Sequence, residues 1–219
     1  MLVKDCMTRH PAMVPPTMAA AEAQKVMMEN KVRHLPVVGD GKKFVGLLTR
    51  GRLAMKPDTI ASLNVWEITR YLSGLTVEDL MIKAEDVYTI EPERTVERAA
   101  RYMSEYKVGA LPVIDEEGIV VGILSEVDVL RSFQQMLGLP ADGVRVTMRM
   151  PNQYGEFAKL ITSIAEKGLG ILGIGSFPSP RRPDYYDVVL KIPRATLEEV
   201  KEILSQVPGQ EIIDIREVA

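Results

Sequence analysis

The chain has few of the residues from which proteins build cross-links and zinc sites. Its 219 residues include a single cysteine, Cys6, and two histidines, His10 and His34. One cysteine cannot form an intrachain disulfide, and a reducing cytoplasm is the simplest location to expect. One cysteine and two histidines at unrelated spacings do not form a zinc site, so no metal is expected. A carboxylate-only metal site stays open, although no motif indicates one.

Long apolar runs and an excess of one charge are also missing. No apolar run approaches the roughly 18 residues that cross a bilayer. The first residues, MLVKDCMTRHP, have no apolar signal-peptide core. The net charge is −3, with both signs spread along the chain, whereas a nucleic-acid binder should show a basic excess. We therefore expect a cytoplasmic globular protein with neither a nucleic-acid nor a membrane partner.

A stretch of the chain recurs 76 positions later. Residues 27–38, MMENKVRHLPVV, align with residues 103–114, MSEYKVGALPVI, and seven of the twelve positions are identical. The opening VKDCM pairs with a later VEDLM, and GLLT pairs with GILS. Residues 1–53 and 77–133 are therefore two copies of one unit, and residues 54–76 form a linker with a helical pattern around Trp66.

Each copy predicts the same element order. A short extended piece leads to a helix, at about 17–30 or 93–106. A strand (LPVV or LPVI), a polar turn, a second strand and a helix opened by Thr49 or Ser125 follow. The order is β-α-β-β-α, with short apolar strands that suit a buried sheet. Because each sheet alone would leave an apolar face uncovered, the copies should pack together about a pseudo-two-fold axis.

Residues 143–219 lack the repeat and predict a second fold. VRVTMRM (144–150) alternates between apolar and polar residues, as a half-buried strand does. Helical spacing follows at 157–165. The remaining predicted elements are strands at about 171–177, 185–192 and 211–217 and a helix at 196–206. The order β-α-β-β-α-β is the ferredoxin-like pattern, so the fold class is α/β (α+β) throughout.

These motifs resemble a known family. The unit that opens with V-x-D-x-M and ends in G-h-h-[ST]-x-x-D resembles the CBS domain, and two in tandem resemble a CBS pair, or Bateman module. The tail is similar to an ACT domain in its element order and in the turn around Gly155. The combination is similar to acetoin-utilisation proteins of the AcuB type. The resemblance implies a regulatory protein and not an enzyme. CBS pairs generally bind adenosine-containing ligands in two clefts, and ACT domains generally bind amino acids or mediate dimerisation.

The second copy ends in GILSEVD, which has two interpretations. Ser125 and Asp128 have the spacing of a helix N-cap and its third helical residue. A carboxylate can also accept hydrogen bonds from both hydroxyls of a ribose, beside helix amides that favour a phosphate. The resemblance implies a main nucleotide cleft formed by Thr89, Gly109, Ala110, Ser125 and Asp128, with Arg33 as a phosphate contact.

The first copy keeps this frame but reverses one charge. Its GLLTRGR places Arg52 where the second copy has Asp128, and arginine can only donate hydrogen bonds. Arg52 is either a phosphate ligand or a solvated helix residue. We therefore predict a second, weaker cleft with His34, Thr49 and Arg52. His34 is more simply a packed or surface histidine than a ligand.

The ACT-like tail has one candidate effector turn, MPNQYGEF. Asn152 stands in the place where ACT domains usually have an acidic residue, and Gly155 is kept. An amide can bond an ammonium group without compensating its charge, so a plain turn is the alternative interpretation.

The leading hypothesis is a regulatory homodimer that senses AMP, ADP, ATP or S-adenosylmethionine, without a required cofactor, and acts on an unknown protein partner. An amino acid at the ACT-like domain and a link to acetoin utilisation belong to the same hypothesis. The alternative is a scaffold that does not sense a ligand and serves for assembly.

Overall fold

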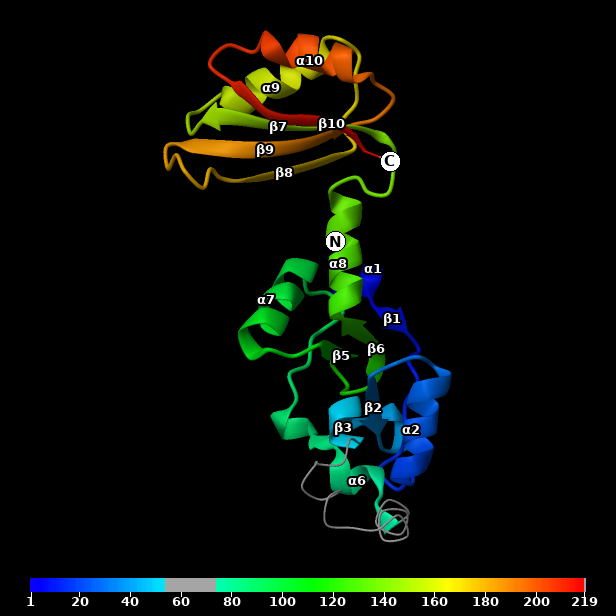
Figure 1. Cartoon of the computed structure of the whole chain (residues 1–219). Helices are drawn as coiled ribbons and strands as arrows, with labels where there is room; N and C mark the ends of the chain where they lie inside the picture. Colours follow the sequence, from blue (N-terminus) through cyan, green and yellow to red (C-terminus); the bar gives the residue numbers. More distant parts are fainter. Residues whose placement is uncertain (54–73, 219) are drawn as a thin grey trace, which may run out of the picture. The chain divides into compact units, whose positions relative to one another are not determined.

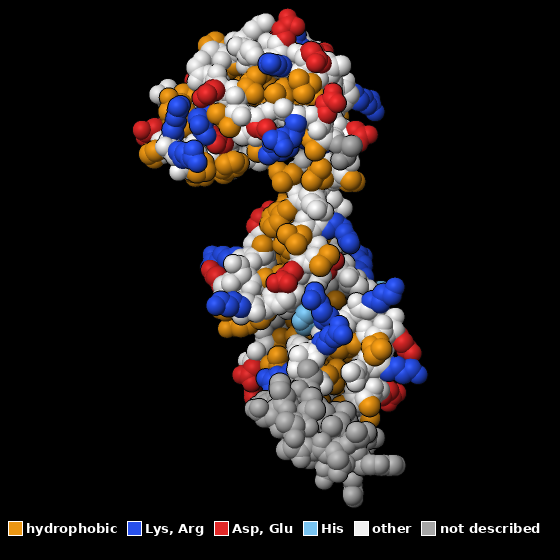
Figure 2. All heavy atoms as spheres, viewed as in Figure 1, with side chains coloured by type: hydrophobic (Ala, Val, Ile, Leu, Met, Phe, Trp, Pro, Cys, Tyr) orange, Lys and Arg blue, Asp and Glu red, His pale blue; other side chains and the backbone are white. Residues whose placement is uncertain are grey.

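The computed structural model describes residues 1–53 and 74–218. The chain divides into two compact units, Met1–Leu130 and Arg131–Ala219, which correspond to the repeats and the tail. Charged side chains of both signs are mixed over the visible surface of each unit (Figure 2). Among the described residues, no helix has the length and apolar character that a membrane span requires. The linker helix expected around Trp66 lies outside the described residues.

The two repeats have matching elements (Figure 1). Each opens with a short helix and a two-residue strand, continues with a longer helix and a β-hairpin, and ends in a helix. In the first repeat these are α1 (Val3–Cys6), β1 (Thr8–Arg9), α2 (Ala20–Glu29), β2 (His34–Val38), a 3₁₀ turn η1 (Asp40–Lys42), β3 (Phe44–Thr49) and α3 (Arg50–Leu53). In the second they are α6 (Val77–Leu80), β4 (Ile82–Lys83), a 3₁₀ turn η2 (Ala84–Asp86), α7 (Val96–Tyr106), β5 (Ala110–Ile114), β6 (Val120–Ser125) and α8 (Glu126–Met136).

The repeats exchange their opening segments. Strand β1 of the first repeat pairs with β6 of the second, and β4 of the second pairs with β3 of the first. The two sheets are therefore β1-β6-β5 and β2-β3-β4. The core of the first repeat includes Val77, which comes from the second. This exchange confirms that the repeats pack together, and it explains why neither sheet is complete within its own repeat.

Hydrogen bonds outside the sheets follow the same exchange. The amide of Val3 donates to the carbonyl of Arg94, at 2.8 Å, just before α7. In the reciprocal contact the amide of Val77 donates to the carbonyl of Met18, at 2.9 Å, just before α2. The hairpin turns also meet, because the amide of Phe44 donates to the carbonyl of Gly118 at 3.0 Å. Each opening helix is thus anchored on the other repeat.

The exchange gives a reason for the glycine in each repeated G-h-h-[ST] motif. A Cβ added at Gly46 would lie 2.5 Å from the carbonyl oxygen of Ile82, in the crossing strand β4. At the equivalent Gly122 it would collide with Met7 and lie 3.1 Å from the carbonyl oxygen of Thr8, beside β1. A side chain at Gly46 would displace the backbone of the crossing strand, and one at Gly122 would displace the Met7 side chain and press on the backbone of Thr8.

We predict that Gly46→Ala destabilises the repeat unit by about 1–3 kcal/mol, because the backbone of the crossing strand has to move. Gly39→Ala is the control, since the nearest atom to its added Cβ is Cγ1 of Val45 at 3.5 Å. The control should stay within about 0.5 kcal/mol of wild type. Urea denaturation measures both, and equal midpoints for the two variants would contradict the crossing contact.

The C-terminal unit has the predicted ferredoxin-like order. It contains β7 (Gly143–Pro151), α9 (Glu156–Ala165), β8 (Gly173–Pro178), β9 (Tyr185–Ile192), α10 (Leu197–Ser205) and β10 (Glu211–Val218). The sheet order is β10-β7-β9-β8, with every pair antiparallel. Both helices lie on the same side of this sheet (Figure 1). Thr196 caps α10 by accepting a hydrogen bond from the amide of Glu199 at 3.2 Å.

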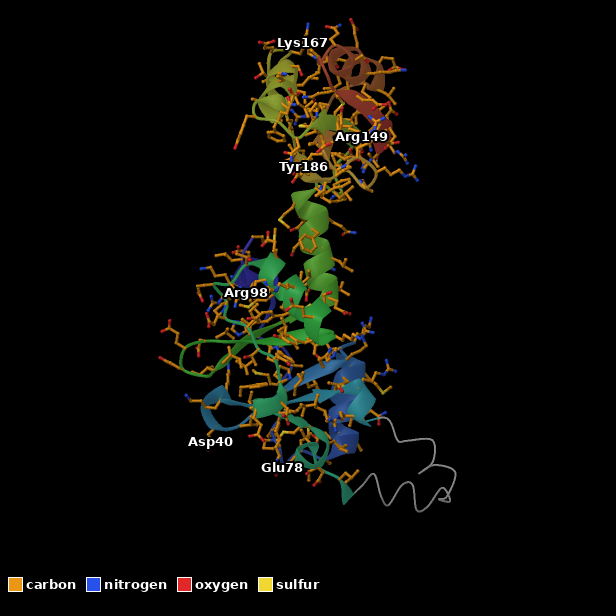
Figure 3. All side chains as sticks on the ribbon, turned by 90° about the vertical axis from the view of Figure 1, so that its left-hand side faces the viewer. Asp40, Glu78, Arg98, Arg149, Lys167 and Tyr186 are labelled. Atoms are coloured by element: carbon orange, nitrogen blue, oxygen red, sulfur yellow. The ribbon has the colours of Figure 1, made fainter. Side chains whose placement is uncertain are left out.

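The alternation of β7 separates an apolar face from a charged one. Val144, Val146, Met148 and Met150 are buried in the core beneath the helices. On the other face Arg149, which lies on the sheet (Figure 3), forms a bidentate pair with Asp187 of β9. The Nε–Oδ1 and Nη2–Oδ2 distances are 2.8 and 2.9 Å. The Asp187 side chain is only 6% exposed, so this pair is largely shielded from water.

The Arg149–Asp187 pair makes a pH prediction for this unit. Hydrogen bonds from Arg149 lower the pKa of the Asp187 carboxyl below its ordinary value. Its stabilisation is therefore complete above the unfolded-state pKa of about 3.9 and is lost as the pH falls through the lower folded-state pKa. Asp187→Asn should unfold at a lower urea concentration than wild type at pH 7. The gap should hold down to about pH 5 and narrow below about pH 4. A gap that is unchanged at pH 3 would contradict the pair's role.

Candidate ligand clefts

Two hollows lie where the repeats meet within the first unit. The Asp128 cleft has a volume of about 460 Å³. Its walls are the opening segment of the first repeat (Thr8 and His10–Ala12), the end of α2 with the residues after it (Asn30–His34), and the start of α8 (Ser125–Asp128), with Gly109, Ala110 and Ile123 between them. The exchange of opening segments therefore joins both repeats in one cleft.

The start of α8 fixes the carboxylate of Asp128. Its Oδ2 accepts a hydrogen bond from the Ser125 hydroxyl at 2.6 Å and one from the Ser125 amide at 2.9 Å. The amide of Asp128 in turn donates to the Ser125 hydroxyl at 3.4 Å. This is the helix start that the spacing predicted. It also orients a half-buried carboxylate at the cleft wall, so helix capping and ligand contact are compatible at one residue.

The second hollow, the Thr49 cleft, has a volume of about 440 Å³. Its walls are the start of α3 (Thr49–Gly51), the opening segment of the second repeat (Ile82 and Asp86–Tyr88) and the residues after α7 (Lys107–Ala110), with Arg33, His34, Leu47 and Glu126. The ring of Tyr88 stacks on that of Tyr106, with centroids 3.7 Å apart and planes 7° from parallel. One aromatic face at this cleft is thus already covered.

Arg52 does not line the cleft that the sequence assigned to it. Its amide donates to the Thr49 hydroxyl at 3.4 Å, which reproduces the capping contact of the second repeat. Its side chain is exposed, and the neighbouring Arg50 lines the cleft in its place. The physical reason is that a carboxylate at this position folds back onto the donors of the capping residue, whereas a guanidinium cannot accept from them.

Thr89 is a second correction. It lines a separate hollow with Ile90, Glu91 and Arg94, and not the Asp128 cleft. The exchange carries the opening segment of the second repeat to the Thr49 cleft, away from Asp128. Successive side chains of an extended segment also point to opposite sides, so Tyr88 faces the Thr49 cleft while Thr89 faces away.

Four predicted residues meet at a wall that the clefts share. Arg33, His34, Gly109 and Ala110 line both hollows, together with Glu126, which was not predicted. A Cβ added at Gly109 would lie 3.4 Å from Cε1 of His34 and 3.6 Å from Oε2 of Glu126, so these two side chains close over the glycine. Burial lowers the pKa of the His34 imidazole below its ordinary value, the positive charge of Arg33 lowers it further, and Glu126 acts in the opposite direction.

Two lysines were missed, although the repeat identifies them. Lys31 and Lys107 stand 76 positions apart, each just after the longer helix of its repeat and each in the left-handed region at φ 54°. Lys31 lines the Asp128 cleft and Lys107 the Thr49 cleft. The signal in the sequence is an identical lysine at the equivalent position of both copies.

The candidate effector turn of the C-terminal unit is built by its glycine. Gly155 stands at the N-cap of α9 with φ 86°, a left-handed conformation that glycine adopts most readily. Asn152 is exposed, and its backbone N–H donates to the carbonyl of Asp184 at 2.8 Å. Effector binding at Asn152 and Gly155 stays a prediction. Among residues 1–53 and 74–218, no group of three or more His, Cys, Asp and Glu side chains is placed to hold a metal ion.

A tandem repeat with exchanged strands and two clefts at its junction is the architecture of a paired regulatory module. The family model of the CBS domain matches residues 3–56 and 77–135, just over half of the chain. The chain therefore belongs to the CBS domain family. The match covers both repeats and leaves the C-terminal unit unassigned, so its ACT-like character stays a prediction.

Solved structures of CBS pairs are similar to the repeat unit. CBSX2, from Arabidopsis thaliana, crystallised in complex with AMP, is 29% identical with a TM-score of 0.51, covering 61% of this chain and 96% of that one. A putative acetoin utilization protein, AcuB, from Vibrio cholerae is 27% identical with a TM-score of 0.52, covering 64% of this chain and 94% of that one.

The curated relatives are longer proteins. The L-aspartate semialdehyde sulfurtransferase of Methanocaldococcus jannaschii is 29% identical over 134 residues, which are 60% of this chain and 23% of that protein. The homoserine O-acetyltransferase of Methanohalobium evestigatum is 30% identical over 135 residues, which are 61% of this chain and 24% of that protein. This chain therefore spans about a quarter of the length of these relatives.

The shared wall predicts a titration that NMR can follow. His34 should titrate below the ordinary histidine pKa of about 6.5. Arg33→Gln should raise the pKa, because it removes a positive charge, and Glu126→Gln should lower it, because it removes a negative one. The His34→Ala spectrum identifies the resonance. Shifts of the same sign in the two variants would contradict this charge arrangement.

Proposed function

We propose that the chain is a regulatory sensor that binds an adenosine-containing ligand, with the Asp128 cleft as its main site. The observation that carries this proposal is the pairing of an oriented acceptor with cations in one hollow. The Asp128 carboxylate is held by Ser125, and Lys31 and Arg33 line the same cleft. A ligand with a hydroxylated end and an anionic end matches this distribution of charge.

The hydroxylated end fits Asp128. A ribose presents two neighbouring hydroxyl donors, and a carboxylate accepts from both without adding a donor of its own. The hydrogen bonds from Ser125 hold the carboxylate in one orientation before a ligand arrives, so less side-chain freedom is lost on binding. The anionic end would lie among Lys31, Arg33 and the amides at the start of α8.

The planar end fits the small residues of the cleft. Ala12, Gly109 and Ala110 allow a flat ring to approach the backbone, and Val32 and Ile123 add apolar surface. The volume of about 460 Å³ lies in the range of small-molecule sites. A CBS pair that is 29% identical to this chain crystallised with AMP, which supports the adenosine class and makes AMP the first ligand to test.

The rest of the proposal extends from the resemblance. The chain would act by regulating a protein partner and not by catalysis, as a homodimer, with an amino acid as the ligand of the C-terminal unit. The structural likeness to the AcuB protein of Vibrio cholerae supports testing for a link to acetoin utilisation. A thermal-shift screen of AMP, ADP, ATP and S-adenosylmethionine would choose the ligand. At 100 times its dissociation constant, a ligand should add roughly 2.7 kcal/mol to stability.

Asp128→Ala should weaken AMP binding by about ten- to a hundredfold, because the two ribose hydroxyls lose a charged acceptor. Calorimetric titration measures the change. Arg52→Ala is the control, since Arg52 holds the equivalent position in the first repeat and lies outside both clefts. It should bind AMP as wild type does. If Asp128→Ala also binds AMP with wild-type affinity, Asp128 is a helix-start residue alone and the ribose contact is wrong.

A further inference from the structure

The clefts differ at one pair of equivalent lining positions in their opening segments, and they differ at their helix starts. Val14 and Ile90 are equivalent, since each forms the single parallel bridge to the first hairpin strand of its own repeat, at Val37 and Val113. Counting back four residues from each gives His10 and Asp86. His10 lines the Asp128 cleft, and Asp86 lines the Thr49 cleft. The opening segments therefore carry a histidine at one cleft and a carboxylate at the other.

The helix starts differ in the opposite sense. The start of α8 contributes Asp128 to its cleft. At the start of α3 the equivalent residue, Arg52, lies outside the cleft, and Arg50, the equivalent of Glu126, lines it. Each cleft thus has one carboxylate of its own, besides Glu126 on the shared wall. In one cleft that carboxylate stands at the helix start, and in the other it stands on the opening segment. The Thr49 cleft therefore has its hydroxyl acceptor on the opening segment, where the Asp128 cleft has its acceptor at the helix start.

From this exchange we propose that Asp86 is the hydroxyl-binding residue of the Thr49 cleft, which takes a ribose-bearing ligand in the reverse orientation. The inference rests on the proposed function, because it assumes the same class of ligand. The hydroxylated end lies at the opening segment, beside Asp86. The anionic end lies toward Arg50 at the helix start, with Lys107 and Arg33 on neighbouring walls.

The surroundings of Asp86 suit this role. Its side chain is exposed and, within residues 1–53 and 74–218, forms no salt bridge or hydrogen bond that its loss would break. Glu126 is the competing carboxylate, but it lines both clefts and lies beside His34 and Gly109. Leu47, Ile82, Val87 and Val108 supply the apolar surface that a base needs, next to Tyr88. The cleft is therefore complete without an acid at position 52.

The test uses Asp128→Ala to weaken ligand binding in the Asp128 cleft, so that binding in the Thr49 cleft can be measured. Calorimetric titrations with AMP and with 2′-deoxy-AMP are run on wild type, on Asp86→Ala, on Asp128→Ala and on the double variant. Glu85→Ala is the matched control, because Glu85 is the adjacent carboxylate of η2 and lines neither cleft. Melting temperatures confirm that each variant is folded.

Wild type should bind two equivalents of AMP, and Asp86→Ala should lose the second equivalent while Glu85→Ala keeps it. Asp128→Ala should keep one equivalent and bind AMP about tenfold more tightly than 2′-deoxy-AMP, because the missing hydroxyl removes a bond to Asp86. The double variant should lose this remaining equivalent, and any residual binding should show no preference for AMP over 2′-deoxy-AMP. The preference reports a hydroxyl contact, which a merely structural role for Asp86 would not change.

Two results would overturn the assignment of Asp86. One is an Asp128→Ala variant that binds no AMP, and the other is a preference for AMP over 2′-deoxy-AMP that survives in the double variant. Failure of the proposed function looks different. If Asp128→Ala keeps both equivalents at wild-type affinity, the ribose contact of Asp128 is wrong. Loss of one equivalent in Asp86→Ala would then still support the hydroxyl contact of Asp86. If wild type binds no adenosine ligand, both proposals fall.

Discussion

The close crossing of each opening segment over a glycine of the other repeat is the constraint on which the first unit depends. A Cβ at Gly46 would meet the backbone of the crossing strand, and a Cβ at Gly122 would meet the Met7 side chain beside the backbone of Thr8. The crossing completes both sheets and places Val77 in the core of the first repeat. It also delivers the opening segments to the clefts, so packing and site geometry have one cause. A repeat separated from its partner would lose a strand, an apolar contact and a cleft wall together.

The sequence predicted the longer helices and the hairpin strands, but neither the opening helices and strands of the repeats nor their exchange. The period of the apolar residues gave the helices and strands, because burial on one face imposes that period whatever the neighbour is. A repeat looks the same whether its opening segment pairs with its own hairpin or with the hairpin of the other copy. Thr89 was therefore assigned to a cleft that it does not line. Lys31 and Lys107 were not predicted, although they are identical residues at equivalent positions of the two copies.

Side-chain chemistry explains which site residues were predicted correctly. Ser125 and Asp128 are neighbours in the sequence, and their contact is local, so spacing alone predicts it. Arg52 has the same spacing, but a donor cannot return to the capping hydroxyl and amide as an acceptor does. In this chain the residue three positions after the cap lines its cleft where it is the acceptor Asp128, and does not where it is Arg52. Arg50 reaches the Thr49 cleft instead, and no local rule distinguishes these two arginines in the sequence.

The reversed charge between GILSEVD and GLLTRGR has a different meaning when whole clefts are compared instead of single motifs. Judged by one motif, the first repeat has lost its acid and its cleft has decayed. When the two clefts are compared, the Thr49 cleft has a carboxylate of its own in Asp86, which stands on the opening segment and not at the helix start. Where duplicated units exchange segments, each cleft is built from both copies. A charged group can then stand on a different segment in each cleft. Comparison of clefts, and not of motifs, is then the test of whether a duplicated site persists.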